Sequence, residues 1–174
     1  MIKFEKVRWK NFLSTGNQFT EIELDRNETT LIIGENGAGK STVLDALCFA
    51  LFGKPFRTIS KSQLINTVNA METVVEIEFS IASRKYKVIR GIKPNKFEIW
   101  QNDKMLNQEA NSRDYQKILE QQILKLNYRS FTQVVILGSS TFVPFMQLNS
   151  KARREVVEDI LDIKIFSHIL CLRC

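Results

Sequence analysis

The sequence predicts an α/β fold with a mixed sheet, an antiparallel β-subdomain and a long last helix. Residues 29–33 form a short run of apolar and β-branched residues, which is typical of a strand buried on both faces of a sheet. A glycine-rich loop follows this run, and apolar residues at helical spacing follow the loop. Residues 73–101 alternate between apolar and polar side chains, which predicts strands with one face in a core.

The first part of the chain supplies two more strands and a helix. Apolar residues spaced by two or three predict a strand over residues 2–10, and a second strand is predicted over 19–24. The helix after the glycine-rich loop covers residues 40–52. Gly53 and Pro55 end it, because glycine accepts a left-handed cap and proline cannot continue a helix.

The β-subdomain contains three antiparallel strands between residues 73 and 101, with turns near 82–83 and 93–95. After Gln108 the spacing is helical again, and one face carries Tyr115, Ile118, Leu119 and Ile123. Residues 134–137 fit either a buried strand or the end of a helix. The last helix is predicted over about 150–169, with Asn149 or Ser150 as its N-cap and an apolar stripe of Val156, Val157, Ile160 and Leu161.

The bulk properties describe one globular lobe with a core. The chain has 174 residues and a formal net charge of +6, which is compatible with a polyanionic partner. It contains no apolar run of about 20 residues and no secretory signal, so we expect a cytoplasmic protein without a membrane contact. We assign residues 1–170 to the lobe, with its β-subdomain at about 72–101, and 171–174 to a tail of unknown role.

The glycine-rich loop carries the functional prediction. It matches the P-loop pattern G-x-x-x-x-G-K-[ST] in full, with Gly34, Glu35, Asn36, Gly37, Ala38, Gly39, Lys40 and Ser41. Glycines allow unusual backbone angles and close approach, so that the N–H groups of residues 36–41 can surround phosphate oxygens. The helix that begins near Lys40 adds the partial positive charge of its N-terminus. The alternative is a glycine-rich turn before an ordinary helix.

The pattern predicts a site for ATP and Mg²⁺ with a role for each polar side chain. Lys40 is expected to reach the β- and γ-phosphates, Ser41 to ligate Mg²⁺, and Thr42 to touch the α-phosphate. ATP hydrolysis also needs an acidic residue on a second buried strand and a group that orients water. The nearest acidic sequence, residues 156–159, sits inside a helical pattern, so no catalytic residue is evident in this chain.

The chain resembles the N-terminal ATPase lobe of the SMC/SbcC-type family of DNA-repair ATPases, the Rad-fifty group. The residues that carry the resemblance are 9–14, Trp-Lys-Asn-Phe-Leu-Ser, and 31–46, which include the P-loop. Later stretches at 51–57, 63–66, 130–138, 144–146 and 152–159 are similar to the large subunits of T4-type phage recombination endonucleases. The similarity extends to about Ile165.

The resemblance implies an ABC-type P-loop head that is completed by other parts. It implies a C-terminal lobe with the signature and acidic motifs, a coiled coil whose root is the last helix, and a homodimer of heads that encloses two ATP molecules. It also implies a nuclease partner of the Mre-eleven/SbcD type and double-stranded DNA ends as the target. In such a complex ATP binding would close the heads, and hydrolysis would reopen them and gate the nuclease.

Further site residues follow from the resemblance or from charge. Lys10, Asn11 and Phe12 are candidates for nucleotide contact. Many relatives carry a glutamine that helps to bind Mg²⁺ before the last helix; here Ser139 aligns near that position, and Gln133 lies upstream in an expected strand. A basic stretch is a candidate DNA surface, with an ordinary solvated sheet face as the alternative: Arg84, Lys85, Lys87 and Arg90.

The cysteines and the competing functions complete the expectations. Cys48 is expected in the core, and the CxxC pair Cys171 and Cys174 is not expected to hold zinc. One alternative function is a transporter-type nucleotide-binding domain, which residues 10–12 and the missing signature motif disfavour. Another is a RecF-like DNA-binding factor without a nuclease partner, and a third is an incomplete fragment that exposes apolar surface.

Overall fold

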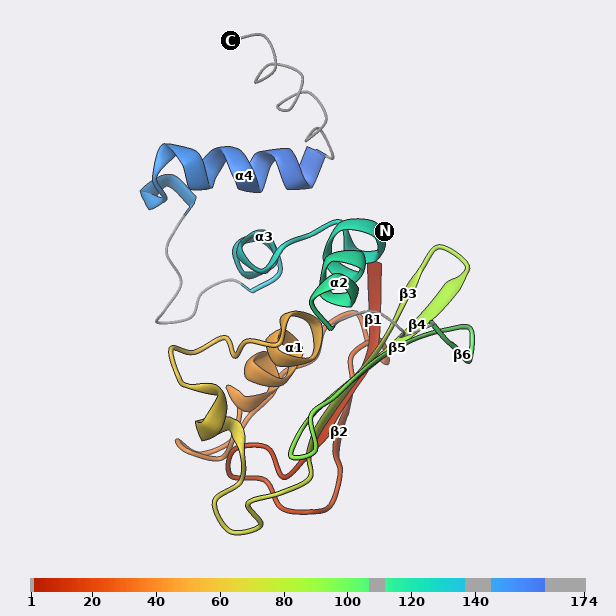
Figure 1. Ribbon diagram of the computed structural model, residues 1–174. Helices are drawn as coiled ribbons and strands as arrows, with labels where there is room; N and C mark the ends of the chain where they lie inside the picture. Colours follow the sequence, from red (N-terminus) through yellow and green to blue (C-terminus); the bar gives the residue numbers. More distant parts are fainter. Residues whose placement is uncertain (1, 107–111, 137–144, 162–174) are drawn as a thin grey trace, which may run out of the picture. The chain divides into compact units, whose positions relative to one another are not determined.

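The computed structural model describes residues 2–106, 112–136 and 145–161, which fall into two compact units, Met1–Tyr115 and Gln116–Cys174 (Figure 1). The first unit is a single six-stranded antiparallel sheet in the order β2-β1-β3-β4-β5-β6. Its strands are β1 (Ile2–Lys10), β2 (Thr20–Glu23), β3 (Thr73–Ile81), β4 (Arg84–Ile92), β5 (Lys96–Gln101) and β6 (Lys104–Met105). The three strands and both turns predicted for the β-subdomain are confirmed.

The core of this unit lies between one face of the sheet and helix α1 (Thr42–Phe52), which lies beside the sheet in Figure 1. Alternate residues of the strands point toward the helix, and the buried ones are Val7, Trp9, Val75, Ile77, Phe79, Val88 and Ile99. Ten of the eleven helix residues are buried, which is expected only for a helix that is apolar all round. Gly53 ends α1 in the predicted left-handed conformation, at φ 68°.

The segment that enters the P-loop differs from its prediction. Residues 29–33 form no strand, and the side chains of Leu31 and Ile33 are 79% and 83% exposed. The sheet of the described residues is therefore antiparallel rather than mixed. A strand buried on both faces needs a backbone partner beside it, and no described segment pairs with this one.

A helical stretch joins the end of the first unit to the start of the second. It comprises α2 (Ser112–Lys117) and the π-helical turn η2 (Ile118–Leu124). The helical spacing predicted after Gln108 is thus confirmed, and Leu119 is completely buried.

The second unit contains α3 (Tyr128–Val134), the short 3-10 turn η3 (Phe145–Gln147) and α4 (Ser150–Leu161). Residues 134–136 continue from the end of α3, so the helix-end alternative is correct and the strand alternative is wrong. Asn149 caps α4, because its Oδ1 accepts a hydrogen bond of 2.8 Å from the Ala152 N–H.

The apolar stripe predicted for the last helix is only partly buried. Val156 is covered, whereas Val157, Ile160 and Leu161 are between 38% and 59% exposed in the described part of α4. Residues 162–169 of the predicted helix lie outside the described residues. No helix of the described ranges is long and apolar enough to cross a membrane.

Candidate functional site

The P-loop combines glycines at positive φ with unpaired N–H groups. Gly37 and Gly39 adopt φ values of 90° and 92°, a region that residues with a Cβ rarely enter. The Ala38 N–H donates to the Glu35 carbonyl at 3.2 Å, so it does not belong to the expected ring of free donors. The remaining donors have no hydrogen-bond partner in the described part of the chain: the N–H groups of Asn36, Gly37, Gly39, Lys40 and Ser41.

The Lys40 ammonium lies against its own loop. Its Nζ donates to the carbonyl oxygens of Gly34 and Glu35 at 2.6 and 2.7 Å. A lysine has three N–H donors, so these two bonds leave one donor for an anion in the loop. The lysine therefore braces the loop and brings a positive charge to its concave side.

Ser41 and Thr42 occupy the start of α1. Ser41 is the N-cap of the helix, but its hydroxyl makes no capping hydrogen bond and the residue is exposed. Thr42 is 4% exposed, and its N–H donates to the Gly39 carbonyl at 2.9 Å. An exposed serine hydroxyl at a helix N-terminus beside a phosphate cradle suits Mg²⁺, which prefers oxygen ligands and keeps several waters.

A pocket of about 540 Å³ opens over the P-loop and has a second wall. One wall is Asn36, Gly37, Gly39, Lys40, Ser41 and Thr42. The other wall comes from two segments far apart in the sequence: Leu13 and Ser14 after β1, and Arg57, Gln63, Ile65 and Thr67 around the 3-10 turn η1 (Lys61–Leu64). The second wall was not predicted from the sequence.

The three residues proposed for nucleotide contact do not line this pocket. Asn11 and Phe12 are 1% and 0% exposed, and Phe12 packs on the Phe49 ring of α1 with a centroid separation of 5.8 Å. The Lys10 Nζ forms an ion pair of 3.1 Å with Glu72. The side chains of Asn11 and Phe12 are therefore buried in the protein interior, and the adjacent residues Leu13 and Ser14 line the pocket instead.

Arg57 is the strongest site residue that the sequence did not reveal. It lines the pocket, and its guanidinium binds the completely buried carboxylate of Asp45. The available signal was Asp45 itself, because an acidic residue within an apolar helix requires a cationic partner.

Of the two candidates for a second Mg²⁺ contact, Gln133 and Ser139, the structure describes only Gln133. Gln133 lies in helix α3 rather than in the expected strand, because residues 128–134 form a capped helix with Asn127 Oδ1 accepting from the Ser130 N–H at 2.9 Å. Ser139 lies outside the described residues, as do Cys171 and Cys174. Among the described residues no group of three or more potential metal-binding side chains occurs.

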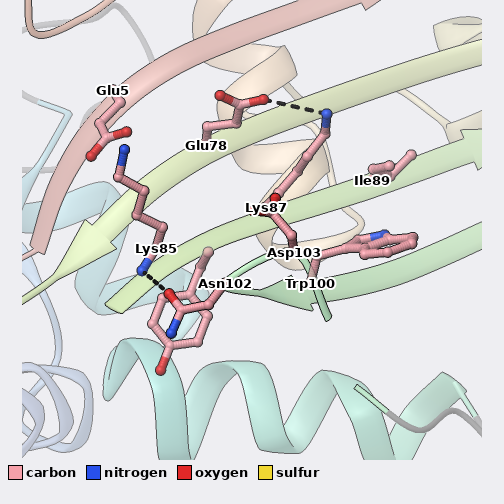
Figure 2. A pocket seen from close by; sticks show the side chains of 9 residues that line it. Glu5, Glu78, Lys85, Lys87, Ile89, Trp100, Asn102 and Asp103 are labelled. Atoms are coloured by element: carbon pink, nitrogen blue, oxygen red, sulfur yellow. Dashed lines mark hydrogen bonds and ion pairs between the residues drawn. The ribbon is translucent and has the colours of Figure 1, made fainter. Parts of the chain in front are cut away.

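The basic stretch does not form one surface. Arg90 points toward α1, where its Nε donates to the Ala50 carbonyl at 3.1 Å and its guanidinium covers the Phe97 ring at 3.8 Å. Lys85 and Lys87 lie on the opposite face, beside a hollow that Figure 2 shows. The Lys87 Nζ pairs with Glu76 and Glu78 at 3.1 and 3.3 Å.

Lys85 and Arg84 keep the exposure that a DNA contact needs. Both residues are exposed at the start of β4. In Figure 2 the Lys85 side chain extends toward Glu5, and its backbone N–H donates to Asn102 Oδ1 at 3.0 Å. Because Lys87 is paired and Arg90 packs on α1 and Phe97, these two cations are the remaining candidates of the four.

Cys48 lies in the core, as expected. It is completely buried on α1, and burial raises the pKa of its thiol from 9.0 to about 12, with a smaller contribution from the charge of Asp45. A thiol with such a pKa stays protonated and unreactive.

Comparison with known proteins identifies sequence relatives. The family model described as AAA domain matches residues 6–167. The chain is 47% identical over 161 residues to exonuclease subunit 2 of Enterobacteria phage T4, and 45% identical to exonuclease subunit 2 of Escherichia phage RB69. These matches cover 92% of the chain but only 29% and 28% of the phage proteins, so the chain spans less than a third of their length. A DNA double-strand break repair Rad50 ATPase of Methanococcus maripaludis is 30% identical over 92% of the chain and 16% of its own length.

Solved structures share the fold. A chain from work titled structural biochemistry of ATP-driven dimerization and DNA stimulated activation of SMC ATPases superposes with a TM-score of 0.63 at 24% identity, over 91% of this chain and 99% of that one. A head bound to the C-winged helix domain of ScpA gives 0.62 at 24% identity, over 91% of this chain and 51% of that one. The chain therefore belongs to the AAA domain family, in the group that holds the phage exonuclease subunits 2, the Rad50 ATPases and the SbcC proteins.

Proposed function

We propose that this chain binds ATP with Mg²⁺ at its P-loop, as the nucleotide-binding half of a DNA-repair ATPase. The observation that carries the proposal is the set of unpaired N–H groups beside the Lys40 ammonium in one pocket, those of Asn36, Gly37, Gly39, Lys40 and Ser41. Such a set is a strong anion site, because the donors and the helix N-terminus act together on one phosphate chain.

The polar side chains of the pocket divide the work on the ligand. In this proposal Lys40 and Arg57 supply positive charge for the polyphosphate, Ser41 provides its hydroxyl as a ligand of Mg²⁺, and Thr42 contacts the α-phosphate. Magnesium bound there would neutralise phosphate charge. No carboxylate lines the pocket within the described ranges, and we infer that the acidic residue for hydrolysis comes from a C-terminal lobe.

Two observations support the proposal that this chain belongs to a larger assembly: the names of its relatives, and the exposed segment of residues 29–33 that precedes the P-loop. The relatives include exonuclease subunits and the SbcC component of the nuclease SbcCD, and these names support a role beside a nuclease at DNA double-strand ends in the cytoplasm. The exposed side chains of Leu31 and Ile33 support a partner lobe that pairs with residues 29–33. In the complete protein, ATP would hold two heads together and its hydrolysis would gate the nuclease.

The deciding experiment is calorimetric titration of the chain with Mg-ATP, with ATP turnover followed in the same samples. Lys40→Ala is expected to weaken binding by roughly 10- to 100-fold, because it removes a charge-assisted contact. Lys104→Ala removes the same charge from exposed β6 and should bind as the unchanged chain does. Absence of ATP binding would refute the proposal. Rapid ATP turnover by the chain alone would refute the inference that the acidic residue for hydrolysis comes from another lobe.

A further inference from the structure

Two distant segments of the pocket wall are joined by buried asparagines. Asn66 is 6% exposed and lies between the lining residues Ile65 and Thr67. Its side-chain Nδ2 donates to the carbonyl oxygens of Leu13 and Thr15, at 3.1 and 3.0 Å. These two bonds stand on either side of Ser14, so one amide fixes both parts of the wall.

The same residue also shapes its own segment. Asn66 Oδ1 accepts from the N–H groups of Val68 and Asn69 at 2.9 and 3.0 Å, and its backbone N–H donates to the Asn11 carbonyl at 3.0 Å. The Leu13 N–H donates to the Leu64 carbonyl at 2.8 Å, beside a β-bridge between Phe12 and Ile65. All side-chain donors and acceptors of Asn66 are therefore used in tying the two segments together.

Asn11 extends this network from the other side. Its Oδ1 accepts from Asn69 Nδ2 at 2.6 Å, and its Nδ2 donates to Asn17 Oδ1 at 3.1 Å. Asn11 and Leu13 adopt φ values of 50° and 55°, which residues with a side chain rarely populate. Such a backbone persists only where the surroundings hold it, so the network maintains a strained loop beside the pocket.

The wall that these asparagines hold has a different chemistry from the P-loop wall. Around Asn66 it offers the side chains of Leu13, Ser14, Ile65 and Thr67, which are apolar or carry a hydroxyl group. The phosphate-binding donors and Lys40 lie on the opposite wall. This part of the second wall carries no charge, although Arg57 belongs to the same wall, and an uncharged surface in a pocket with an anion cradle suits the sugar and base of a nucleotide rather than its phosphates.

We propose that Asn66 is a positioning residue, which holds the Leu13–Ser14 and Ile65–Thr67 segments in register so that the pocket binds the nucleoside part of its ligand. This inference rests on the proposed ATP site and concerns the part of the ligand beyond the phosphates. It predicts that loss of the Asn66 amide lowers the affinity for ATP but leaves the affinity for inorganic tripolyphosphate nearly unchanged.

The test is calorimetry of the chain with Mg-ATP and, separately, with magnesium tripolyphosphate. Asn66→Ala is expected to weaken ATP binding by about tenfold and to change tripolyphosphate binding by less than about twofold. Lys40→Ala should weaken the binding of both ligands. Asn102→Ala is the control, because the Asn102 side chain also accepts a hydrogen bond from a backbone N–H but lies at the β5–β6 turn. This variant should change neither affinity.

The outcomes separate the two proposals. If Asn66→Ala lowers the affinity for both ligands equally, or does not lower the affinity for ATP, the positioning role is overturned. Failure of the unchanged chain to bind either ligand overturns the ATP site itself. Circular dichroism checks the fold; if Asn66→Ala is unfolded, Asn69→Ala takes its place, because it removes only the 2.6 Å bond to Asn11 Oδ1. The same preferential loss of ATP affinity, smaller in size, is then expected, and its absence refutes the role.

Discussion

The Asp45 carboxylate holds Arg57 by its side chain and its backbone together. Asp45 Oδ2 accepts from Arg57 Nε at 2.7 Å and Nη2 at 2.6 Å, while Oδ1 accepts from the N–H groups of Phe56 and Arg57 at 3.1 and 3.0 Å. The carboxylate is completely buried on α1, and the Arg57 side chain is 43% exposed at the pocket. A residue of the P-loop helix thus fixes the loop that follows the helix.

Replacing Asp45 is expected to free Arg57 and destabilise the fold. Asp45→Asn removes the charge-assisted bonds and should lower the free energy of unfolding by about 1–3 kcal/mol. Arg57→Lys keeps the charge but cannot reproduce the paired contact, so it should show a similar loss. Urea unfolding of both variants and of the double variant measures the coupling. If the losses of unfolding free energy in the two single variants add up to that of the double variant, Asp45 and Arg57 have no coupling energy.

Gly37 is expected to be irreplaceable for conformational reasons alone. A Cβ at this position would meet no atom within 4 Å, but φ is 90°. Gly37→Ala should therefore cost about 1–2 kcal/mol of unfolding free energy through strain, or rearrange the loop and weaken ATP binding. Gly16→Ala is the control, since a Cβ there also meets nothing and φ is not positive. Equal behaviour of the two variants would contradict this explanation.

Arg90 is expected to stabilise the C-terminal end of α1 rather than bind DNA. Arg90→Leu removes the bond to the Ala50 carbonyl, a favourable charge at the negative end of the helix and the contact with the Phe97 ring. We expect a loss of about 1–3 kcal/mol in urea unfolding. Arg84→Leu, on the same strand but exposed, should stay within about 0.5 kcal/mol.

Salt-dependent DNA binding provides the complementary check. The Arg84 variant should weaken binding to duplex DNA if the start of β4 touches phosphates, whereas the Arg90 variant should not once its fold is intact. A larger DNA defect in a folded Arg90 variant would contradict the assignment.

Cys48 is expected to make the chain less stable in alkaline solution. Its pKa is raised from 9.0 to about 12 in the fold, so the folded chain keeps a proton that the unfolded chain loses. The corresponding stability is complete below pH 9 and is lost as the pH rises from 9 toward 12, by up to about 1.4 kcal/mol per pH unit. Urea unfolding at about pH 8 and about pH 10 should show a smaller decline for Cys48→Ala than for the unchanged chain.

Alkylation gives an independent measurement of the same thiol. Iodoacetamide should modify Cys48 only after unfolding, because the reagent attacks the thiolate and the buried thiol stays protonated. Peptide mapping is needed to distinguish it from Cys171 and Cys174. Rapid modification of Cys48 in the folded chain would contradict its burial.

The sequence was most informative where local pattern and tertiary environment agree. The alternation over residues 73–101 predicted three strands with both turns correctly placed, because one face of each strand carries side chains of the core. The P-loop and the glycine that ends α1 were recognisable because their backbone conformations demand particular residues. The run at 29–33 failed, since its strand character depends on a backbone partner that local sequence cannot supply.

The second wall of the pocket was not predictable for a related reason. Leu13 and Thr67 are ordinary residues, and only hydrogen bonds between segments about 50 positions apart bring them together, such as the bond from Asn66 to the Thr15 carbonyl. Asparagine side chains in loops suggest turns, but the pattern does not say which distant carbonyl they reach. Asn11 was therefore interpreted as a ligand contact, although its side chain is buried in the network.

The irregularity of β1 sets a limit on how this strand can vary. The pairing with β3 shifts between Phe4 and Lys6, so Glu5 is an extra residue without a partner in the ladder. Phe4 can then meet the Phe79 ring at 6.0 Å while Val7, three positions later, enters the same core. Strand residues normally share a face only at even spacing. Deleting Glu5 would leave Phe4 and Val7 two positions apart and still on one face, whereas a regular pairing that includes Glu5 would turn Ile2 and Phe4 outward, so at this point β1 accepts the loss of a residue but not the loss of the bulge alone.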